Sequence, residues 1–172
     1  MFDFSGKTVG EIRKAAREHA KLVRTTYKAL TIPVNPVAVA RAMGASVFIA
    51  ELGDDVYGML INDDAGPNIY IDRDQPAVRQ RFTCAHEVGH LYSHLGDTRT
   101  FVDARSDEGR GTASEIYANE FAAELLMPEE ELRTRIDPNL SDLDQYSENS
   151  RLAREFDVSL SALVYRRKLL NV

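Results

Sequence analysis

Two histidines four residues apart, with a glutamate directly after the first, form the most informative pattern in the chain. They are His86, Glu87 and His90, within the segment HEVGH. On a helix, residues four apart share one face and lie about 6 Å apart along the axis, so both imidazoles can reach one metal ion. Glu87 then points beside that ion, where a carboxylate can take a proton from an activated water. This spacing is typical of zinc sites that hydrolyse peptide bonds.

An HExxH segment also arises by chance, as two surface histidines and a glutamate on an amphipathic helix. The context favours the metal site, because the motif lies in a predicted helix over residues 74–94 that follows a predicted strand. Asp74 is expected to cap this helix, with Pro76 in its first turn. Gly89 costs about 1 kcal/mol relative to Ala inside a helix, which indicates a close contact with the sheet or another helix.

A zinc site of this kind needs a third protein ligand and keeps one position for water. His94 continues the four-residue spacing, but it lies about 12 Å from His86 along a continuous helix, too far to share an ion. A third histidine at that distance requires a glycine turn, HExxHxxGxxH, which this chain lacks. His94 is therefore expected to be structural or to lie at the rim of the site.

A carboxylate on the next predicted helix, residues 114–127, is the better candidate for the third ligand. Glu115 begins this helix, and Asn119 lies one turn later, where it can bond the second nitrogen of either imidazole. The residues alone leave the assignment open, because Thr112 and Glu115 also match a capping box, which would give Glu115 a helix-start role only. Further carboxylates on the same helix are Glu120 and Glu124.

The elements before the motif predict a small α+β domain. Residues 9–30 have the spacing of an amphipathic helix, and a short helix is expected over 36–43. Three strand-like runs with turn residues between the last two predict a small, mostly antiparallel sheet. These runs are 46–52, 56–61 and 68–71. Residues 96–113 are polar and contain glycines, so they are expected to form a loop.

The C-terminal part predicts a helical tail. After a short helix that Pro128 opens and a polar connection over 137–150, two short helices are expected to meet at residues 157–159. We therefore predict a domain over residues 1–136 and a tail over 137–172 packed on it.

This final helix pair resembles a helix-turn-helix unit, and its second helix carries a basic cluster. The cluster consists of Arg166, Arg167 and Lys168. A helix that reads DNA needs base-contacting side chains near its start, where this chain has only Ser159 and its apolar and small neighbours. A helical pair packed on the domain is the favoured interpretation, and direct DNA binding stays open.

Composition narrows the classes of function. The 172 residues carry a formal net charge of −6, which argues against an extensive phosphate-binding surface. The single cysteine, Cys84, excludes an intrachain disulfide. The N-terminus lacks a secretory leader, and no apolar run approaches the roughly 20 residues that span a bilayer. These features predict a cytoplasmic protein without a membrane partner.

HEVGH followed by ExxANxFAAELLMP resembles the ImmA/IrrE family of metallo-endopeptidases. The upstream segments NPVAVARAMGASV and GPNIYIDRD also match the family layout, and the resemblance covers residues 30–130, with a looser match in the tail. The matching residues of the second motif are Glu115, Ala118, Asn119, Phe121, Ala122, Ala123, Leu125, Leu126, Met127 and Pro128.

The resemblance implies a zincin-like, more specifically gluzincin-like, zinc endopeptidase. Carried over by position, it implies His86, His90 and Glu115 as the zinc ligands and Glu87 as the catalytic base. It further implies that the substrate is a helix-turn-helix repressor of the XRE type, whose cleavage derepresses genes of a mobile element, phage or stress response.

Two hypotheses from different classes follow. One is a zinc peptidase that cleaves a transcriptional repressor. The other is a DNA- or protein-binding regulator whose zinc site is structural or vestigial. The sequence does not single out the group that helps to stabilise the oxyanion. Candidates by position are Tyr92, His94, Arg99 and Tyr117.

Overall fold

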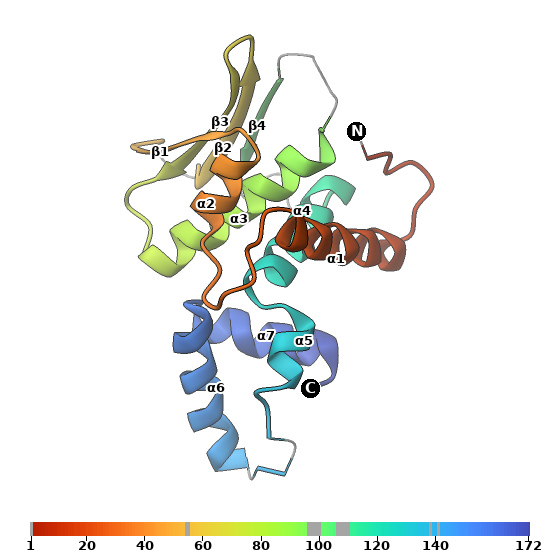
Figure 1. Cartoon of the computed structure of the whole chain (residues 1–172), viewed down its shortest axis with the longest axis vertical. Helices are drawn as coiled ribbons and strands as arrows, with labels where there is room; N and C mark the ends of the chain where they lie inside the picture. The colour runs from red at the N-terminus through yellow and green to blue at the C-terminus, as the bar shows by residue number, and fades with distance from the viewer. Residues whose placement is uncertain (1, 54–55, 96–100, 106–110, 138, 141) are drawn as a thin grey trace.

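The computed structural model shows a mixed α+β fold, with a sheet at one end and the C-terminal helices at the other (Figure 1). It describes every residue except 1, 54–55, 96–100, 106–110, 138 and 141, and only the backbone of 101–105 and 142–143. The elements in chain order are α1 (Val9–Thr26), α2 (Pro36–Ala42), β1 (Ser46–Ala50), β2 (Gly58–Asp63), β3 (Gly66–Asp72), α3 (Ala77–Ser93), β4 (Phe101–Arg105), α4 (Ala113–Leu126), α5 (Glu129–Arg133), α6 (Asp142–Phe156) and α7 (Leu160–Leu170).

The four strands form one sheet in the order β1-β3-β2-β4. β2 pairs antiparallel with both β3 and β4, whereas β1 pairs parallel with β3. The prediction of a small, mostly antiparallel sheet is therefore confirmed. Leu60, Ile69 and Ile71 are fully buried on the face of the sheet that α3 covers. Successive strand residues point to opposite faces, so this alternation places the sheet directly against the helix that carries HEVGH.

The prediction of a loop over residues 96–113 was wrong in part, because residues 101–105 form β4. β4 pairs with β2 through the backbone, which brings together segments about 40 residues apart in the chain. Such pairing leaves a weak local signal, because its hydrogen bonds depend on a partner strand that is distant in sequence. The remaining parts of that expected loop include 96–100 and 106–110, which lie outside the described residues.

Helix α3 begins at Ala77, three residues later than the predicted start. Asp74 is therefore not its cap, and that prediction was wrong. Pro76 occupies the cap position with an extended backbone, φ −55° and ψ 145°. Because proline disfavours the helical region for the residue before it, Gln75 cannot extend the helix towards Asp74.

Helix α4 lies along both α1 and α3, and Gly89 of α3 lies directly against α4. A Cβ on Gly89 would lie 3.1 Å from Cα of Ala118 and 3.2 Å from Cβ of Phe121. The prediction that this glycine marks a close contact with another helix is confirmed. The absent side chain lets the backbone of α4 approach the turn that contains His90.

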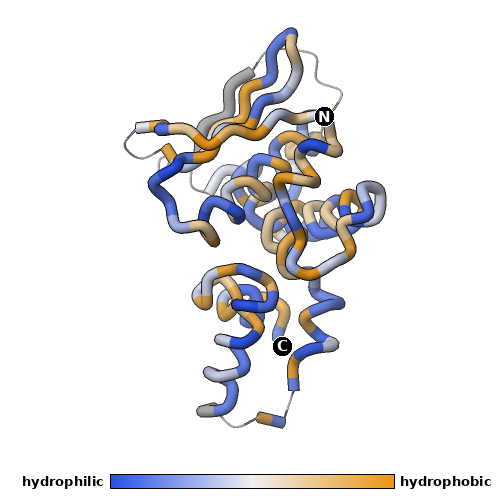
Figure 2. The backbone as a smooth tube through the Cα atoms, turned by 60° about the vertical axis from the view of Figure 1, so that its left-hand side comes forward, coloured by the Kyte–Doolittle hydropathy of each residue, from blue (hydrophilic) through white to orange (hydrophobic). Residues whose placement is uncertain are grey.

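The C-terminal helices join where predicted, since α6 ends at Phe156 and α7 begins at Leu160. α6 is longer than expected, because it already begins at Asp142, within the stretch predicted to be a polar connection. Its sequence is mostly hydrophilic (Figure 2). Few apolar residues therefore mark the 3.6-residue period by which a helix is predicted from sequence. Arg81 of α3 ties the turn between the two helices to the rest of the chain, with its Nε 2.9 Å from Oδ2 of Asp157.

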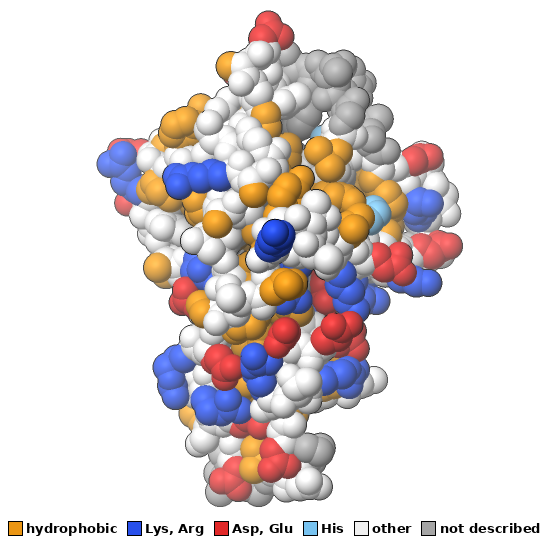
Figure 3. Space-filling model, in the orientation of Figure 1, with side chains coloured by type: hydrophobic (Ala, Val, Ile, Leu, Met, Phe, Trp, Pro, Cys, Tyr) orange, Lys and Arg blue, Asp and Glu red, His pale blue; other side chains and the backbone are white. Residues whose placement is uncertain are grey.

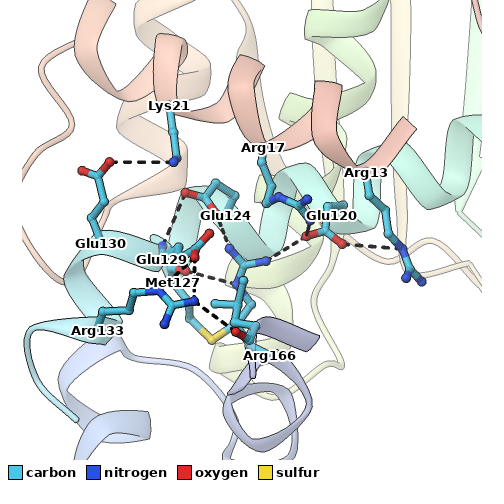
Figure 4. A network of polar contacts seen from close by, with 11 residues as sticks. Arg13, Arg17, Lys21, Glu120, Glu124, Met127, Glu129, Glu130, Arg133 and Arg166 are labelled. Carbon is cyan, nitrogen blue, oxygen red and sulfur yellow. Dashed lines mark hydrogen bonds and ion pairs between the residues drawn. The ribbon is translucent and has the colours of Figure 1, made fainter. Parts of the chain in front are cut away.

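A buried charge cluster, the Arg166 cluster, holds α7 against α4 (Figure 4). It consists of Arg166 with Glu120 and Glu124, and Arg166 is only 1% exposed. The guanidinium donates from Nη1 to Oε1 of Glu120 at 2.8 Å, from Nη2 to Glu124, and from Nε to the carbonyl of Met127. Arg17 of α1 also donates to Glu120, at 3.0 Å. The cluster therefore links three helices.

No helix within the described residues is both long enough and apolar enough to cross a membrane.

Candidate metal centre

His86 and His90 project from the same face of α3, as the four-residue spacing predicts. Their Nε2 atoms lie 2.9 Å apart, and both side chains are almost fully buried. The helix is continuous from Ala77 to Ser93, so the distance between the two imidazoles is fixed by the pitch of one turn.

Glu115 reaches the same point from the first turn of α4. Its Oε1 lies 3.1 Å from Nε2 of His90, and its Oε2 lies 3.5 Å from Nε2 of His86. The capping alternative is partly realised as well, because the hydroxyl of Thr112 accepts from the backbone N–H of Glu115 at 3.3 Å. The backbone of Glu115 thus helps to start the helix while its carboxylate lies at the imidazoles.

His86, His90 and Glu115, here called the three-ligand cluster, have the separations expected for ligands of one ion. Their candidate ligand atoms all lie within 4.8 Å of one another. Tetrahedral zinc with bonds of about 2.0–2.1 Å holds its ligand atoms about 3.3 Å apart. The observed separations of 2.9, 3.1 and 3.5 Å bracket that value. Two neutral imidazoles and one carboxylate are also a donor set that zinc accepts in hydrolytic sites.

Each imidazole makes a second contact through its other ring nitrogen. Nδ1 of His86 lies 3.2 Å from Oδ1 of Asn119, and Nδ1 of His90 lies 3.2 Å from Oγ of Ser114. The Asn119 amide oxygen can only accept, so this bond places the proton on Nδ1 and leaves the Nε2 lone pair for a metal. The contact of Ser114 was not predicted. Its position directly before Glu115, on the helix expected to return to the site, was the available signal.

Glu87 lies on the sheet side of α3 and is 1% exposed. It is not among the three side chains whose ligand atoms converge. Its carboxylate lies close to β2, since a Cβ built on Gly58 would be 2.9 Å from its Oε1. Glu87 follows His86 on α3, and its carboxylate is separate from the three groups that converge.

The electrostatics of the site favour an ionised carboxylate. In the metal-free protein, burial raises the pKa of Glu115, but hydrogen bonds with His86 and His90, together with the positive charge that these imidazoles carry when protonated, lower it more, so the net shift is downward. Cys84, two residues before His86, behaves differently. Burial, with a further contribution from Glu87, raises the pKa of its thiol to about 12. Cys84 is therefore a neutral core residue, as predicted.

Several other residues considered for the site lie elsewhere. Tyr117 is fully buried and its hydroxyl lies 2.7 Å from Nδ1 of His19. Tyr92 packs against His19 and Phe121. Both tyrosines therefore belong to an aromatic cluster on the α1 side. Glu120 and Glu124 are held in the Arg166 cluster, which removes them as alternatives to Glu115.

Two further candidates remain. His94 is the C-cap of α3 and is not among the residues whose ligand atoms converge. Arg99 lies outside the described residues.

The profile of the peptidase M78 family, described as the IrrE N-terminal-like domain, matches residues 40–168, about three quarters of the chain. The chain belongs to the ImmA/IrrE family. The match includes all of α3 and α4, so every residue of the three-ligand cluster falls inside it. Membership indicates the fold of a metallopeptidase family.

Two individual proteins are also similar to this ImmA/IrrE family member. Uncharacterized immunity region protein 2 of Bacillus phage phi105 is 28% identical over 95 residues, which cover 55% of this chain and 60% of the phage protein. A solved Mycobacterium tuberculosis transcriptional regulator superposes with a TM-score of 0.60 and 19% identity, over 92% of this chain and 50% of that one. At this identity the second likeness concerns the fold alone. The chain spans less than two thirds of both proteins.

Proposed function

We propose that this chain is a zinc-dependent endopeptidase of the zincin-like, gluzincin-like type. The observation that carries the proposal is the convergence of Nε2 of His86, Nε2 of His90 and the carboxylate of Glu115 at mutual distances of 2.9–3.5 Å. Zinc held by these atoms supplies an acidified water and a positive charge for the developing oxyanion. Residues 1–136 are proposed to form the peptidase domain and 137–172 its tail.

The chain's own residues then supply positioning and proton transfer. Asn119 and Ser114 orient the two imidazoles through their Nδ1 atoms. Glu87 accepts a proton from the attacking water while the water oxygen bonds to the scissile carbonyl carbon. The same carboxyl group returns the proton to the leaving nitrogen as the C–N bond breaks.

The substrate that we propose is a helix-turn-helix repressor of the XRE type. Support comes from the family, and from the similarity to a protein named for a phage immunity region. Cleavage of such a repressor would derepress the genes that it silences.

The alternative of a DNA-binding regulator rests on the helix-turn-helix-like pair α6 and α7. The surroundings of the three basic residues of α7 weaken this alternative, because most of them are not available to bind DNA. Arg166 is buried in the Arg166 cluster, and Arg167 donates to Glu148 at 2.9 Å. Of the three basic residues, Lys168 alone is exposed. On the face seen in Figure 3, acidic and basic side chains are interspersed over the lower half of the molecule, where α5–α7 lie, and they form no basic stripe there.

A Glu87→Gln variant separates the two hypotheses. Because Glu87 is not a proposed ligand, the variant should retain about one zinc per chain by elemental analysis. Its cleavage of a purified XRE-type repressor should fall by about 10²–10⁴-fold. Glu130→Gln, at a side chain that is 84% exposed, is the matched control and should cleave as wild type does. Equal repressor relief by wild type and Glu87→Gln in a reporter assay would instead support the regulator.

A further inference from the structure

Gly58, the first residue of β2, is buried directly against the face of α3 that carries Glu87. Its backbone φ is not in the left-handed region, so conformational freedom does not explain the glycine. The explanation is space. A Cβ at this position would lie 2.4 Å from Cγ2 of Thr83 and 2.9 Å from Oε1 of Glu87. Both distances are shorter than carbon and oxygen atoms tolerate without movement.

Neither β2 at Gly58 nor the side chain of Thr83 can move away easily. Gly58 lies in the middle of the sheet, paired with Ile71 of β3 and with Arg105 of β4. Thr83 is fully buried and β-branched, which restricts its rotamers on a helix. A methyl group at position 58 would therefore push against both Thr83 and the Glu87 carboxylate.

A short chain of hydrogen bonds fixes the position of the start of β2 relative to α3. Oγ1 of Thr83 donates to Oε1 of Gln75 at 3.2 Å, and Nε2 of Gln75 donates to the carbonyl of Tyr57 at 2.6 Å. Tyr57 is the neighbour of Gly58, and Thr83 lies one helical turn before Glu87. The start of β2, which contains Gly58, is therefore tied through Gln75 to the turn of α3 that precedes Glu87.

We propose that Gly58 is a positioning residue for Glu87, leaving between β2 and α3 the room in which the carboxylate of the general base lies. The inference rests on the proposed function, because it assigns the base role to Glu87. A side chain at position 58 would turn the carboxylate away from the water that it must deprotonate. The three-ligand cluster, whose members are not among the atoms nearest to a Cβ at position 58, would keep its geometry.

The first test needs neither metal nor activity. Denaturant unfolding of the metal-free protein is compared for Gly58→Ala in three backgrounds: wild type, Thr83→Ser and Glu87→Ala. Thr83→Ser removes Cγ2 but keeps the hydroxyl bonded to Gln75, and Glu87→Ala removes the carboxylate. We expect Gly58→Ala to lower the unfolding midpoint, and each second change to recover part of the loss. An unchanged loss in the Glu87→Ala background would overturn the proposed contact.

The second test measures turnover. It distinguishes whether the space at Gly58 is needed for the packing of Thr83 or for the position of the Glu87 carboxylate. The Gly58→Ala/Thr83→Ser double variant should fold, bind one zinc and give the wild-type visible spectrum with cobalt. Its kcat on a purified XRE-type repressor should nonetheless fall by about 100-fold with little change in KM, as expected for a misplaced catalytic group. Wild-type kcat in this variant would show that Gly58 serves only the packing of Thr83, and the proposal would fail.

Matched controls isolate the effect. Thr83→Ser alone should keep wild-type kcat. Gly10→Ala, in α1, adds a Cβ whose nearest neighbour is 3.9 Å away, and it should lower neither stability nor turnover. If wild type cleaves no repressor, the proposed function fails, but the unfolding comparison still decides whether Gly58 and Glu87 are in contact.

Discussion

Helix α4 carries two charge clusters that differ in what completes them. At its start, Glu115 meets two imidazoles whose Nε2 atoms converge on it, and all three groups can donate lone pairs. Near its end, Glu120 and Glu124 share the guanidinium of Arg166, which donates hydrogen bonds to both carboxylates. Glu115 and Glu124 are separated by only about 14 Å along the helix. We propose that a divalent cation completes the first cluster, whereas the second is balanced by the chain's own cation.

This difference teaches how carboxylates on one helix can have opposite roles. Burial raises the pKa of Glu124, and Arg166 opposes this shift. Because Arg166 is only 1% exposed, water cannot take the place of its guanidinium beside the two carboxylates. The role of the Arg166 cluster is therefore structural. In the three-ligand cluster, the imidazoles keep their Nε2 atoms aligned through Asn119 and Ser114, which is the arrangement of a site prepared for a ligand.

The largest effect on stability is expected from Arg166→Met. The substitution leaves the buried carboxylate of Glu124 without its paired cation and leaves Glu120 only the arginines of α1, and loss of one partner of a buried ion pair costs about 3–5 kcal/mol. The free energy of unfolding, measured with urea, should fall by that amount. Arg133→Met removes a half-exposed ion pair with Glu129 and should cost at most about 1 kcal/mol. Equal losses in both variants would contradict the contrast between the clusters.

Zinc itself should stabilise only through the three-ligand cluster. At a free zinc concentration of 100 times the dissociation constant, a ligand that binds the native state adds about 2.7 kcal/mol. Thermal unfolding of wild type should therefore shift upward with zinc and return with a chelator. His90→Ala should lose the shift, whereas Arg133→Met should keep it. A zinc-dependent shift that survives in His90→Ala would place the metal elsewhere.

Gly89→Ala probes the contact that brings α4 to the site. The added methyl would lie 3.1 Å from Cα of Ala118, which is backbone and cannot turn aside. Overpacking of this kind costs about 1–3 kcal/mol. Because Ala118 lies one turn after Glu115, zinc affinity should fall together with the free energy of unfolding. Loss of stability at unchanged zinc affinity would show that the position of Glu115 does not depend on this contact.

The smallest expected effect concerns His19, a histidine outside both clusters. Burial lowers its pKa from the usual 6.5, so the folded state keeps it neutral where the unfolded state takes up a proton. Stability of the metal-free protein should consequently decline as pH falls below about 6.5. His19→Gln should reduce this decline, as measured by urea unfolding between pH 7 and pH 5. An identical pH dependence in the variant would assign the whole decline to other groups.

The sequence predicted the parts of the molecule that local periodicity encodes. The spacing of His86 and His90 predicted their shared face, and the glycine at position 89 predicted a close helix contact, which Ala118 provides. Position in the chain already made Glu115 the preferred third ligand, and the family resemblance strengthened that prediction. From the residues alone, its capping role competed, and the structure shows that Thr112 does bond its backbone.

Features that depend on distant partners were not predicted. β4 forms by pairing with β2, and the start of α6 lies in a stretch without a clear apolar period. The sequence placed Arg166 in a basic cluster whose role in DNA binding stayed open, whereas two glutamates on α4 bury its side chain. Gly58 was overlooked, although a glycine inside an otherwise apolar strand is a signal of close approach.

The most direct test of the three-ligand cluster is a zinc titration against a competing chelator, with wild type, Glu115→Gln and Asn119→Ala compared side by side. Asn119 contacts only the outer nitrogen of His86, so its loss should weaken zinc binding by about 10- to 100-fold. Glu115→Gln removes a proposed ligand and should weaken binding by more than about 100-fold. Wild-type affinity in Glu115→Gln would contradict the assignment of this carboxylate to the metal.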